Sequence, residues 1–113
     1  MEHIIIMPLI GSVDTMRARD ITRALLAGIR EHRAQAVILD ITGVPIVDSG
    51  VADHLNKTIQ AARLKGARTI VTGISDAVAE TIVDLGIDVG EVKTTATMRD
   101  ALADAVQLVG QGR

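Results

Sequence analysis

The sequence predicts an α/β fold: a central mixed, largely parallel sheet of four to five strands with about four helices packed on it. Stretches with the pattern of strands alternate with stretches at helical spacing, and little connecting sequence separates them. Apolar residues make up 48% of the chain and aromatic residues 0%, so short aliphatic side chains must form the core. Neither a linker nor an internal repeat divides the 113 residues, and we expect residues 1–113 to form one domain.

The first half of the chain predicts two strands, each followed by a helix. The β-branched run 4–9 is the first strand, and Asp14 or Thr15 is expected to cap the helix that follows. Apolar residues at helical spacing mark that helix: Ile21, Leu25 and Ile29. The nearly continuous apolar run 36–41 predicts a strand that is covered on both faces. A second helix begins near Ser49 and places four apolar residues on one face: Val51, Leu55, Ile59 and Ala62.

The second half repeats the alternation. A third strand at 69–72 precedes a helix that Ser75 caps, and a weak strand is expected at 91–94. Thr97 begins the fourth helix, with Asp100 at the spacing of a capping box. The inward residues expected in that helix are Met98, Leu102, Ala105 and Val109. Glycines end the second and third helices: Gly66 and Gly86.

Composition excludes several classes of function. Without cysteine there is no disulfide, thiol nucleophile or thiolate metal site. The absence of aromatic residues and the balance of 12 basic and 14 acidic residues argue against nucleic-acid binding. No apolar run approaches the roughly 20 residues that span a bilayer, and residues 1–6 lack the features of a signal peptide. We therefore expect no membrane insertion and a cytoplasmic location.

The three histidines give no sign of catalysis or metal binding. His3, His32 and His54 do not have the spacing of helical metal ligands. His54 is the one histidine near Ser49 in sequence, but it lies more than a helical turn away. We expect neither an enzyme nor a cofactor.

The connection at residues 40–50 holds the most polar groups after a predicted strand, which is where functional residues of parallel sheets lie. Ser49 has two interpretations. Its hydroxyl can cap the helix, or it can accept a phosphate, which the helix dipole would stabilise by roughly 0.3 to 1 kcal/mol. A phosphate adds about −1.5 to −2 of charge, and this charge would disfavour a complex whose partner covers the site.

Residues 37–49, with the sequence VILDITGVPIVDS, resemble the signature of STAS domains, the anti-sigma factor antagonist fold. Segments 7–15, 72–75 and 81–87 are similar to the stressosome branch of that family, which regulates the general stress sigma factor of bacteria. The similarity covers about residues 4–109. It implies a non-catalytic regulatory domain of stress signalling that is switched by phosphorylation.

The resemblance also implies partners and sites. Ser49 occupies the place that a dedicated serine/threonine kinase with a histidine-kinase-like ATPase fold phosphorylates, and the unmodified domain is expected to bind that kinase. Thr81 is the candidate for a second phosphorylated residue, with Thr72 and Ser75 as near alternatives. Other STAS proteins are expected partners, in a homo- or hetero-oligomer. We expect the loop and the helix start to contact partners through six residues: Asp40, Thr42, Asp48, Ser49, Gly50 and Asp53.

One departure concerns the start of the fold. STAS domains usually begin with a strand antiparallel to the one expected at 4–9, and here only residues 1–3 precede it. Either the chain is trimmed from a longer protein with an N-terminal sensory domain, or the strand is absent and its apolar neighbour is an exposed edge.

Two alternatives remain open. A response-regulator receiver would need acidic residues after the first strand, where the chain has Met7 to Gly11. A nucleotide- or lipid-binding STAS module of a larger sensor is the main alternative, although the sequence contains no glycine-rich phosphate loop. Stabilisation by GTP or ATP would favour this alternative over a pure switch.

Overall fold

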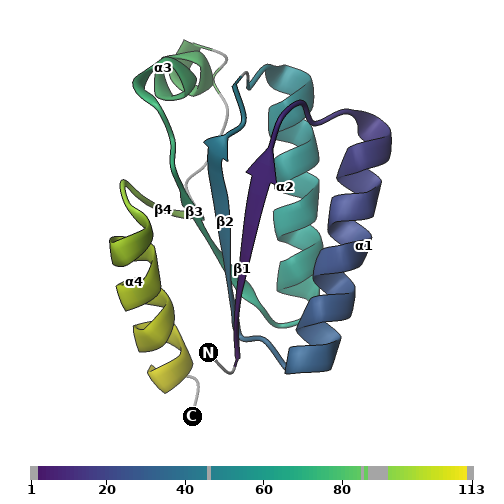
Figure 1. The fold of residues 1–113 in the computed structure, drawn as a ribbon, viewed down its shortest axis with the longest axis vertical. Helices are drawn as coiled ribbons and strands as arrows, with labels where there is room; N and C mark the ends of the chain where they lie inside the picture. The colour runs from purple at the N-terminus through teal and green to yellow at the C-terminus, as the bar shows by residue number, and fades with distance from the viewer. Residues whose placement is uncertain (1–2, 46, 85, 87–91, 112–113) are drawn as a thin grey trace.

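The computed structural model describes residues 3–45, 47–84, 86 and 92–111. Strands and helices alternate along the chain in the predicted order (Figure 1): β1 (Ile4–Ile10), α1 (Thr15–His32), β2 (Ala36–Gly43), α2 (Ser49–Leu64), β3 (Arg68–Thr72), α3 (Asp76–Asp84), β4 (Lys93–Thr95) and α4 (Met98–Gln111). The α/β prediction is confirmed. The weak strand was expected at 91–94, and β4 instead begins at Lys93; Glu91 lies outside the described residues.

The four strands form one sheet in the order β1-β2-β3-β4, and each neighbouring pair is parallel. Ile6 pairs with Ile38, and Ile38 pairs with Ile70, so the strands run in register across the sheet. The expected fifth, antiparallel strand is not found within the described part of the chain. Because all pairs are parallel, the carboxyl ends of the strands meet at one end of the sheet.

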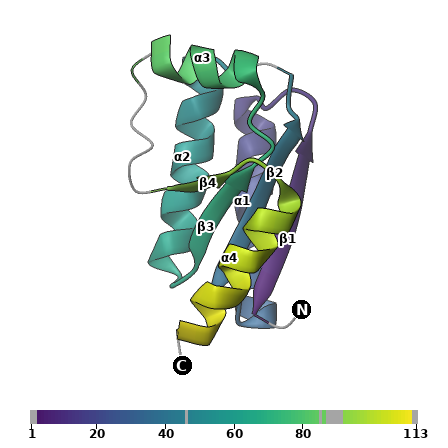
Figure 2. The ribbon, with the colours of Figure 1, turned by 90° about the vertical axis from the view of Figure 1, so that its left-hand side faces the viewer.

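Two layers of helices cover the sheet. Figures 1 and 2 show α1 and α2 side by side on one face, α4 on the other face, and α3 beyond the carboxyl ends of the strands. The crossover helices α1 and α2 pack back onto one face of the sheet, as parallel pairing requires, whereas α3, which connects β3 to β4, lies at the end of the strands. As a result, α3 and the loop before α2 lie at the same end of the molecule.

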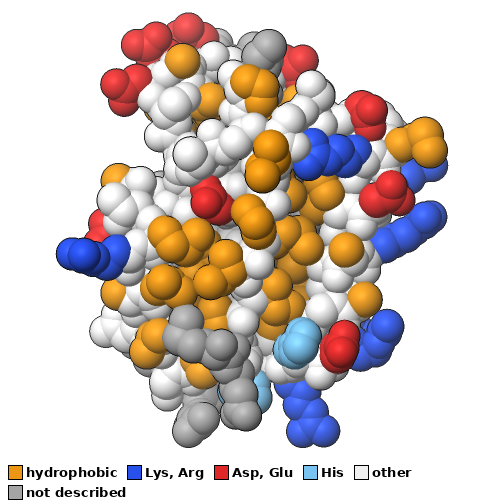
Figure 3. All heavy atoms as spheres, viewed as in Figure 1, with side chains coloured by type: hydrophobic (Ala, Val, Ile, Leu, Met, Phe, Trp, Pro, Cys, Tyr) orange, Lys and Arg blue, Asp and Glu red, His pale blue; other side chains and the backbone are white. Residues whose placement is uncertain are grey.

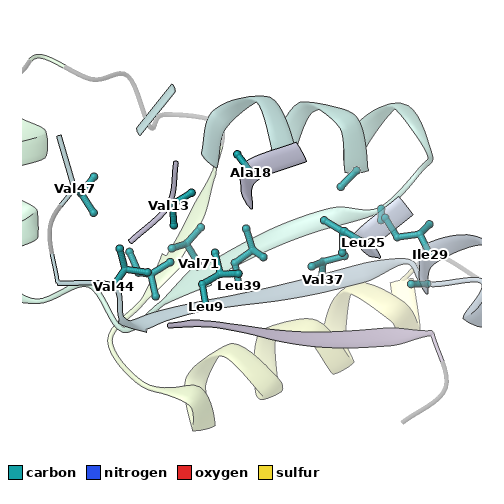
Figure 4. Packing of buried hydrophobic residues seen from close by; sticks show 14 of the residues in the cluster. Leu9, Val13, Ala18, Leu25, Ile29, Val37, Leu39, Val44, Val47 and Val71 are labelled. Carbon is teal, nitrogen blue, oxygen red and sulfur yellow. The ribbon is translucent and has the colours of Figure 1, made fainter. Parts of the chain in front are cut away.

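The core consists of two aliphatic clusters, one on each face of the sheet. Val37 and Leu39 of β2 belong to the cluster under α1 and α2, part of which Figure 4 shows. Ile38 of β2 belongs to the cluster under α4, where it packs with Ala101 and Ala105. Residues 37–39 are all 0% exposed. Because both faces of β2 are buried, its sequence is a nearly continuous run of apolar residues.

Small side chains bring α4 close to the sheet. Ala101 and Ala105 are fully buried, whereas Met98, Leu102 and Val109, which were expected to be inward, are only partly buried. The sequence analysis included Ala105 but missed Ala101.

The helix starts use short polar side chains as expected. Asp14, and not Thr15, caps α1, because its Oδ1 accepts from the backbone N–H of Arg17 at 2.8 Å. Ser75 Oγ accepts from the N–H of Val78 at 3.1 Å, and Thr97 Oγ1 accepts from the N–H of Asp100 at 3.2 Å. These bonds satisfy amides that a helix leaves unpaired in its first turn.

β1 is an edge of the described sheet. Its Ile6 is 45% exposed and its Ile10 69%, and Figure 3 shows hydrophobic side chains gathered over β1 and α4 on this face. Pro8, which has no N–H to donate, fits an edge strand. Within the described chain, this edge of the sheet therefore carries exposed apolar side chains.

The central position of Ile38 leads to a stability prediction. We expect Ile38→Ala to lower the free energy of unfolding by about 2 to 5 kcal/mol, because it leaves a cavity in a site that is 0% exposed. Urea unfolding measures the change. The control is Leu64→Ala, at a residue 87% exposed, which should change stability by less than about 0.5 kcal/mol. Equal losses in the two variants would contradict the assignment of the core.

Candidate functional site

The candidate site lies where β2 and β3 end. The loop from β2 leads to α2, and the segment after β3 leads to α3. Parallel pairing of Asp40 with Thr72 places the two strand ends beside each other. The structure therefore brings together polar groups from two segments about 30 residues apart in sequence.

Asp40 and Thr42 bond to each other at the end of β2. Asp40 Oδ1 accepts from the backbone N–H of Thr42 at 3.0 Å and from its hydroxyl at 2.6 Å. Both residues were predicted to bind a partner. Asp40 is half-buried and Thr42 exposed, so the structural role of this pair is to fix the strand end.

Gly73 makes this close approach possible. Its φ of +83° belongs to the left-handed region, and a Cβ there would lie 2.7 Å from Asp40 Oδ1 and 2.7 Å from the backbone nitrogen of Thr42. Thr42 Oγ1 would be in contact as well. Only glycine fits between the two strand ends. The sequence predicts that Gly73 ends the third strand, and β3 does end at Thr72. The contact of Gly73 with the end of β2 was missed, because no local pattern reveals a contact with another strand.

The loop between β2 and α2 is anchored in the core. Val44 and Val47 are each 3% exposed, and both point into the cluster shown in Figure 4. The N–H of Val44 also donates to the carbonyl of Ile41 at 3.0 Å. Buried side chains on the loop therefore hold the start of α2 in place.

Asp48 is the N-cap of α2. Its Oδ1 accepts from the N–H of Val51 at 2.8 Å, and its carbonyl accepts from the N–H of Ala52 at 2.9 Å. Ser49 is the first residue of α2 and is exposed, and within the described part of the chain its hydroxyl has no hydrogen-bond partner. The simpler interpretation of Ser49 as a cap is therefore wrong, because Asp48 already holds that place.

The other residues predicted at this helix start are also exposed. Gly50 follows Ser49 in the first turn, and Asp53 forms an ion pair with Lys57 at 2.9 Å along the same helix. With both side chains more than half exposed, this pair contributes little to stability. The surface beside Ser49 is therefore accessible to solvent, and Lys57 balances the negative charge of Asp53.

The three candidates for a second phosphorylated residue differ in access. Thr72 is 1% exposed, and Ser75 caps α3. Thr81 is half-buried on α3, and its hydroxyl donates to the carbonyl of Ala77 at 2.9 Å. Burial argues against phosphorylation of Thr72. Phosphorylation of Ser75 would remove the cap of α3 and so destabilise that helix.

His54 belongs to the contact between α1 and α2. Its Nε2 lies 3.4 Å from Thr15 Oγ1 at the start of α1. The hydroxyl of Thr58 donates to the His54 carbonyl at 3.0 Å and lies 2.9 Å from the Thr22 hydroxyl. The sequence did not predict the contacts of His54 with Thr15 and of Thr58 with Thr22, because they join helices whose residues are more than 30 positions apart.

The described residues offer neither a metal site nor a membrane-spanning helix. Among the residues that the structure describes, no group of three or more His, Asp or Glu side chains is placed to hold a metal ion. None of the described helices combines the length and apolar character that crossing a membrane requires.

The fold and the strand-end loop define a known class of regulatory domain. The family profile of the STAS domain matches residues 1–105, and the chain belongs to that family. The family named from the sequence is therefore confirmed.

Relatives support the stressosome branch of the family. The RsbT co-antagonist protein RsbRA of Bacillus subtilis is 45% identical over 107 residues, which are 95% of this chain and 39% of that protein. RsbRD of the same organism is 42% identical over 99 residues, which are 88% of this chain and 36% of that protein. A structure of RsbS from Moorella thermoacetica is similar in fold, with a TM-score of 0.76 and 24% identity, over 92% of this chain and 88% of that chain. The chain spans less than two fifths of the length of these two co-antagonists.

Gly73 offers a test of the strand-end geometry. We expect Gly73→Ala to destabilise the fold by more than the roughly 1 to 2 kcal/mol that a left-handed residue costs, because its Cβ would also collide with Asp40 and Thr42. Gly66→Ala is the matched control, since Gly66 has φ +86° and nothing within 4 Å of the added Cβ. Thermal or urea unfolding compares the two. Equal losses would show that the close approach does not exist.

A second prediction compares the stability effects of substitutions at the adjacent residues Asp48 and Ser49. Asp48→Ala should cost about 0.5 to 2 kcal/mol of stability, because it removes the cap of α2. Ser49→Ala should change stability by less than about 0.5 kcal/mol, since it removes an exposed hydroxyl. Urea unfolding of both variants measures the difference, and a larger loss for Ser49→Ala would reverse the assignment of the cap.

Proposed function

We propose that this chain is a non-catalytic regulatory domain of bacterial stress signalling, which binds a serine/threonine kinase and is switched by phosphorylation of Ser49. The exposed Ser49 hydroxyl at the first residue of α2 carries the proposal. Because Asp48 makes the capping bond, a kinase can modify Ser49 without removing a bond that holds the helix.

The free domain tolerates the phosphate better than a complex does. At the start of α2 the helix dipole favours an anion by roughly 0.3 to 1 kcal/mol, and water solvates the remaining charge. The neighbouring Asp48 carboxylate opposes part of this gain. A partner that covers Ser49 excludes the water, and the unsolvated charge of about −1.5 to −2 then weakens the complex.

The proposed partners are of two kinds. The first is a serine/threonine kinase with a histidine-kinase-like ATPase fold, which contacts the exposed groups beside Ser49, namely Gly50 and Asp53. The second is other STAS proteins, in a homo- or hetero-oligomer. The names of the relatives support the second kind, since RsbRA and RsbRD are called RsbT co-antagonists and a structure of similar fold is titled as the architecture of the stressosome. The proposed location of this signalling complex is the cytoplasm.

We retain Thr81 as the proposed second phosphorylation site. Its hydroxyl is the more accessible alternative to Thr72, but it already donates to the Ala77 carbonyl. Phosphorylation would break that bond within α3, so we expect Thr81 to be modified after, and more slowly than, Ser49.

Intact-mass spectrometry after incubation with the cognate kinase and ATP tests the proposal. A phosphate adds about 80 Da, and we expect a first, faster shift of this size that disappears in Ser49→Ala; modification of Thr81 would add a second, slower one. The matched control is Ser12→Ala, which removes another exposed serine hydroxyl and should leave the shift unchanged.

A binding measurement separates modification from recognition. Ser49→Ala should still bind the kinase, because the loop and the Asp48 cap remain. Ser49→Asp should bind more weakly, although one carboxylate carries less charge than a phosphate. No mass shift in the native chain, or the same number of phosphates on Ser49→Ala as on the native chain, would refute phosphorylation at this residue.

A further inference from the structure

The two faces of the sheet are covered unequally. α1 and α2 lie side by side on one face, whereas α4 is the one described helix on the other, since α3 lies beyond the strand ends (Figures 1 and 2). Ile38 and Ile70, on the two central strands, pack with Ala101 and Ala105 of α4. Within the described chain, α4 therefore covers the centre of this face, and no second helix lies over β1 at its edge.

β1 directs apolar side chains toward the uncovered part of this face. Ile5 and Leu9 belong to the cluster on the α1 and α2 side. Because side chains alternate along a strand, Ile6, Pro8 and Ile10 lie on the α4 side. All three are exposed, and β1 contains no charged residue.

The side of α4 that borders the same area is also apolar. Asp104 forms an ion pair with Lys93 of β4, so it marks the side of α4 that faces β4. At about 100° per residue, three apolar residues lie roughly 140 to 160° around the helix from Asp104, on the side toward β1: Leu102, Val106 and Val109. Figure 3 shows hydrophobic side chains of both elements on one face. We call Ile6, Pro8 and Ile10, together with these three residues, the β1–α4 surface.

The outer side of α4 carries almost no charge. After Asp100, the one charged residue of the helix is Asp104, which is already paired with Lys93. The exposed residues in that part of the helix are small or uncharged: Ala103, Val106, Gln107 and Gly110. Helices on the surface of globular proteins normally carry charged or polar residues on the outward face, and helices that are apolar all round are normally buried. The composition of α4 therefore indicates that a partner covers it.

We propose that the β1–α4 surface binds a second copy of this chain, so that α4 of each copy lies on β1 of the other, beside the α4 already there. This inference names a surface for the homo-oligomer of the proposed function and rests on that part of it. The charges favour α4 as the occupant, because an uncharged helix side matches a surface without charged residues, whereas α1 carries Arg19, Arg23 and Arg30 on its exposed side. Exchange about a two-fold axis forms the same contact twice.

We expect the interface to be small. α4 has 14 residues and is about 21 Å long at 1.5 Å per residue. A standard interface buries about 800 Å² on each partner, from roughly 20 to 30 residues. The β1–α4 surface and its neighbours bury less than this, so we expect a reversible dimer with a Kd of roughly 10 to 100 μM.

Sedimentation equilibrium of the native chain, from about 1 μM to about 1 mM, measures the dimer. We expect the mass to rise from 11.9 kDa to twice that value as the concentration increases. Val106→Glu should raise the Kd about tenfold or more, because it places a carboxylate in an apolar contact. The matched control is Val83→Glu, the same change at a valine of α3 that is 77% exposed, and it should leave the Kd unchanged.

Cross-linking identifies the occupant. The chain contains no cysteine, so single thiols can be introduced at chosen positions. When chains with Ile10→Cys and chains with Val106→Cys are mixed, a short bismaleimide should join one to the other, and intact mass identifies the product. Leu64→Cys, at a residue 87% exposed at the end of α2, is the control in place of Ile10→Cys and should give no such product.

Three results would overturn the inference: a chain that stays monomeric at about 1 mM, a dimer that Val106→Glu and Val83→Glu weaken equally, or a dimer without the cross-link between positions 10 and 106. Ser49→Ala should dimerise like the native chain, and Val106→Glu should still be phosphorylated at Ser49. Failure of this inference can therefore be distinguished from failure of the phosphorylation proposal.

Discussion

The burial of β2 on both faces is the constraint on which the rest of the structure depends. Residues 36–39 of this strand are 0% exposed, and alternate side chains enter the two separate aliphatic clusters. A strand of this kind needs cover on both faces, since uncovered apolar faces would remain in water, and here α1 and α2 on one face and α4 on the other supply it. The carboxyl end of β2 is therefore fixed in position. The hydrogen bonds from Thr42 to Asp40 fix the last residues of β2, from which the loop to α2 begins.

The start of α2 divides two tasks between adjacent residues. Asp48 stabilises the helix through its bond to Val51, and Ser49 is left exposed with its hydroxyl available. A residue that both capped the helix and accepted the phosphate would couple modification to unfolding of the first turn. For the proposed phosphorylation of Ser49, this separation would let a modification change partner binding and leave the fold intact.

α2 connects two regions of different charge. Its first turn lies beside the Asp48 carboxylate, and its last turns line a cavity with Arg68 and Lys93. The helix packs on α1 through Thr58 and Thr22, whose hydroxyls lie 2.9 Å apart. Its two ends therefore present surfaces of different charge on one domain.

The sequence by itself determined the alternation of strands and helices, the double burial of β2, the caps at Ser75 and Thr97 and the family. These features depend on local periodicity and on short polar residues at helix starts, which single segments encode. Only the tertiary structure decided that Asp48 and not Ser49 is the cap, that Gly73 must be glycine, and that Arg68, Thr69 and Lys93 line one cavity. These three features depend on exact backbone positions or on contacts with residues from distant segments. Only the packing of the whole chain determines such positions and contacts.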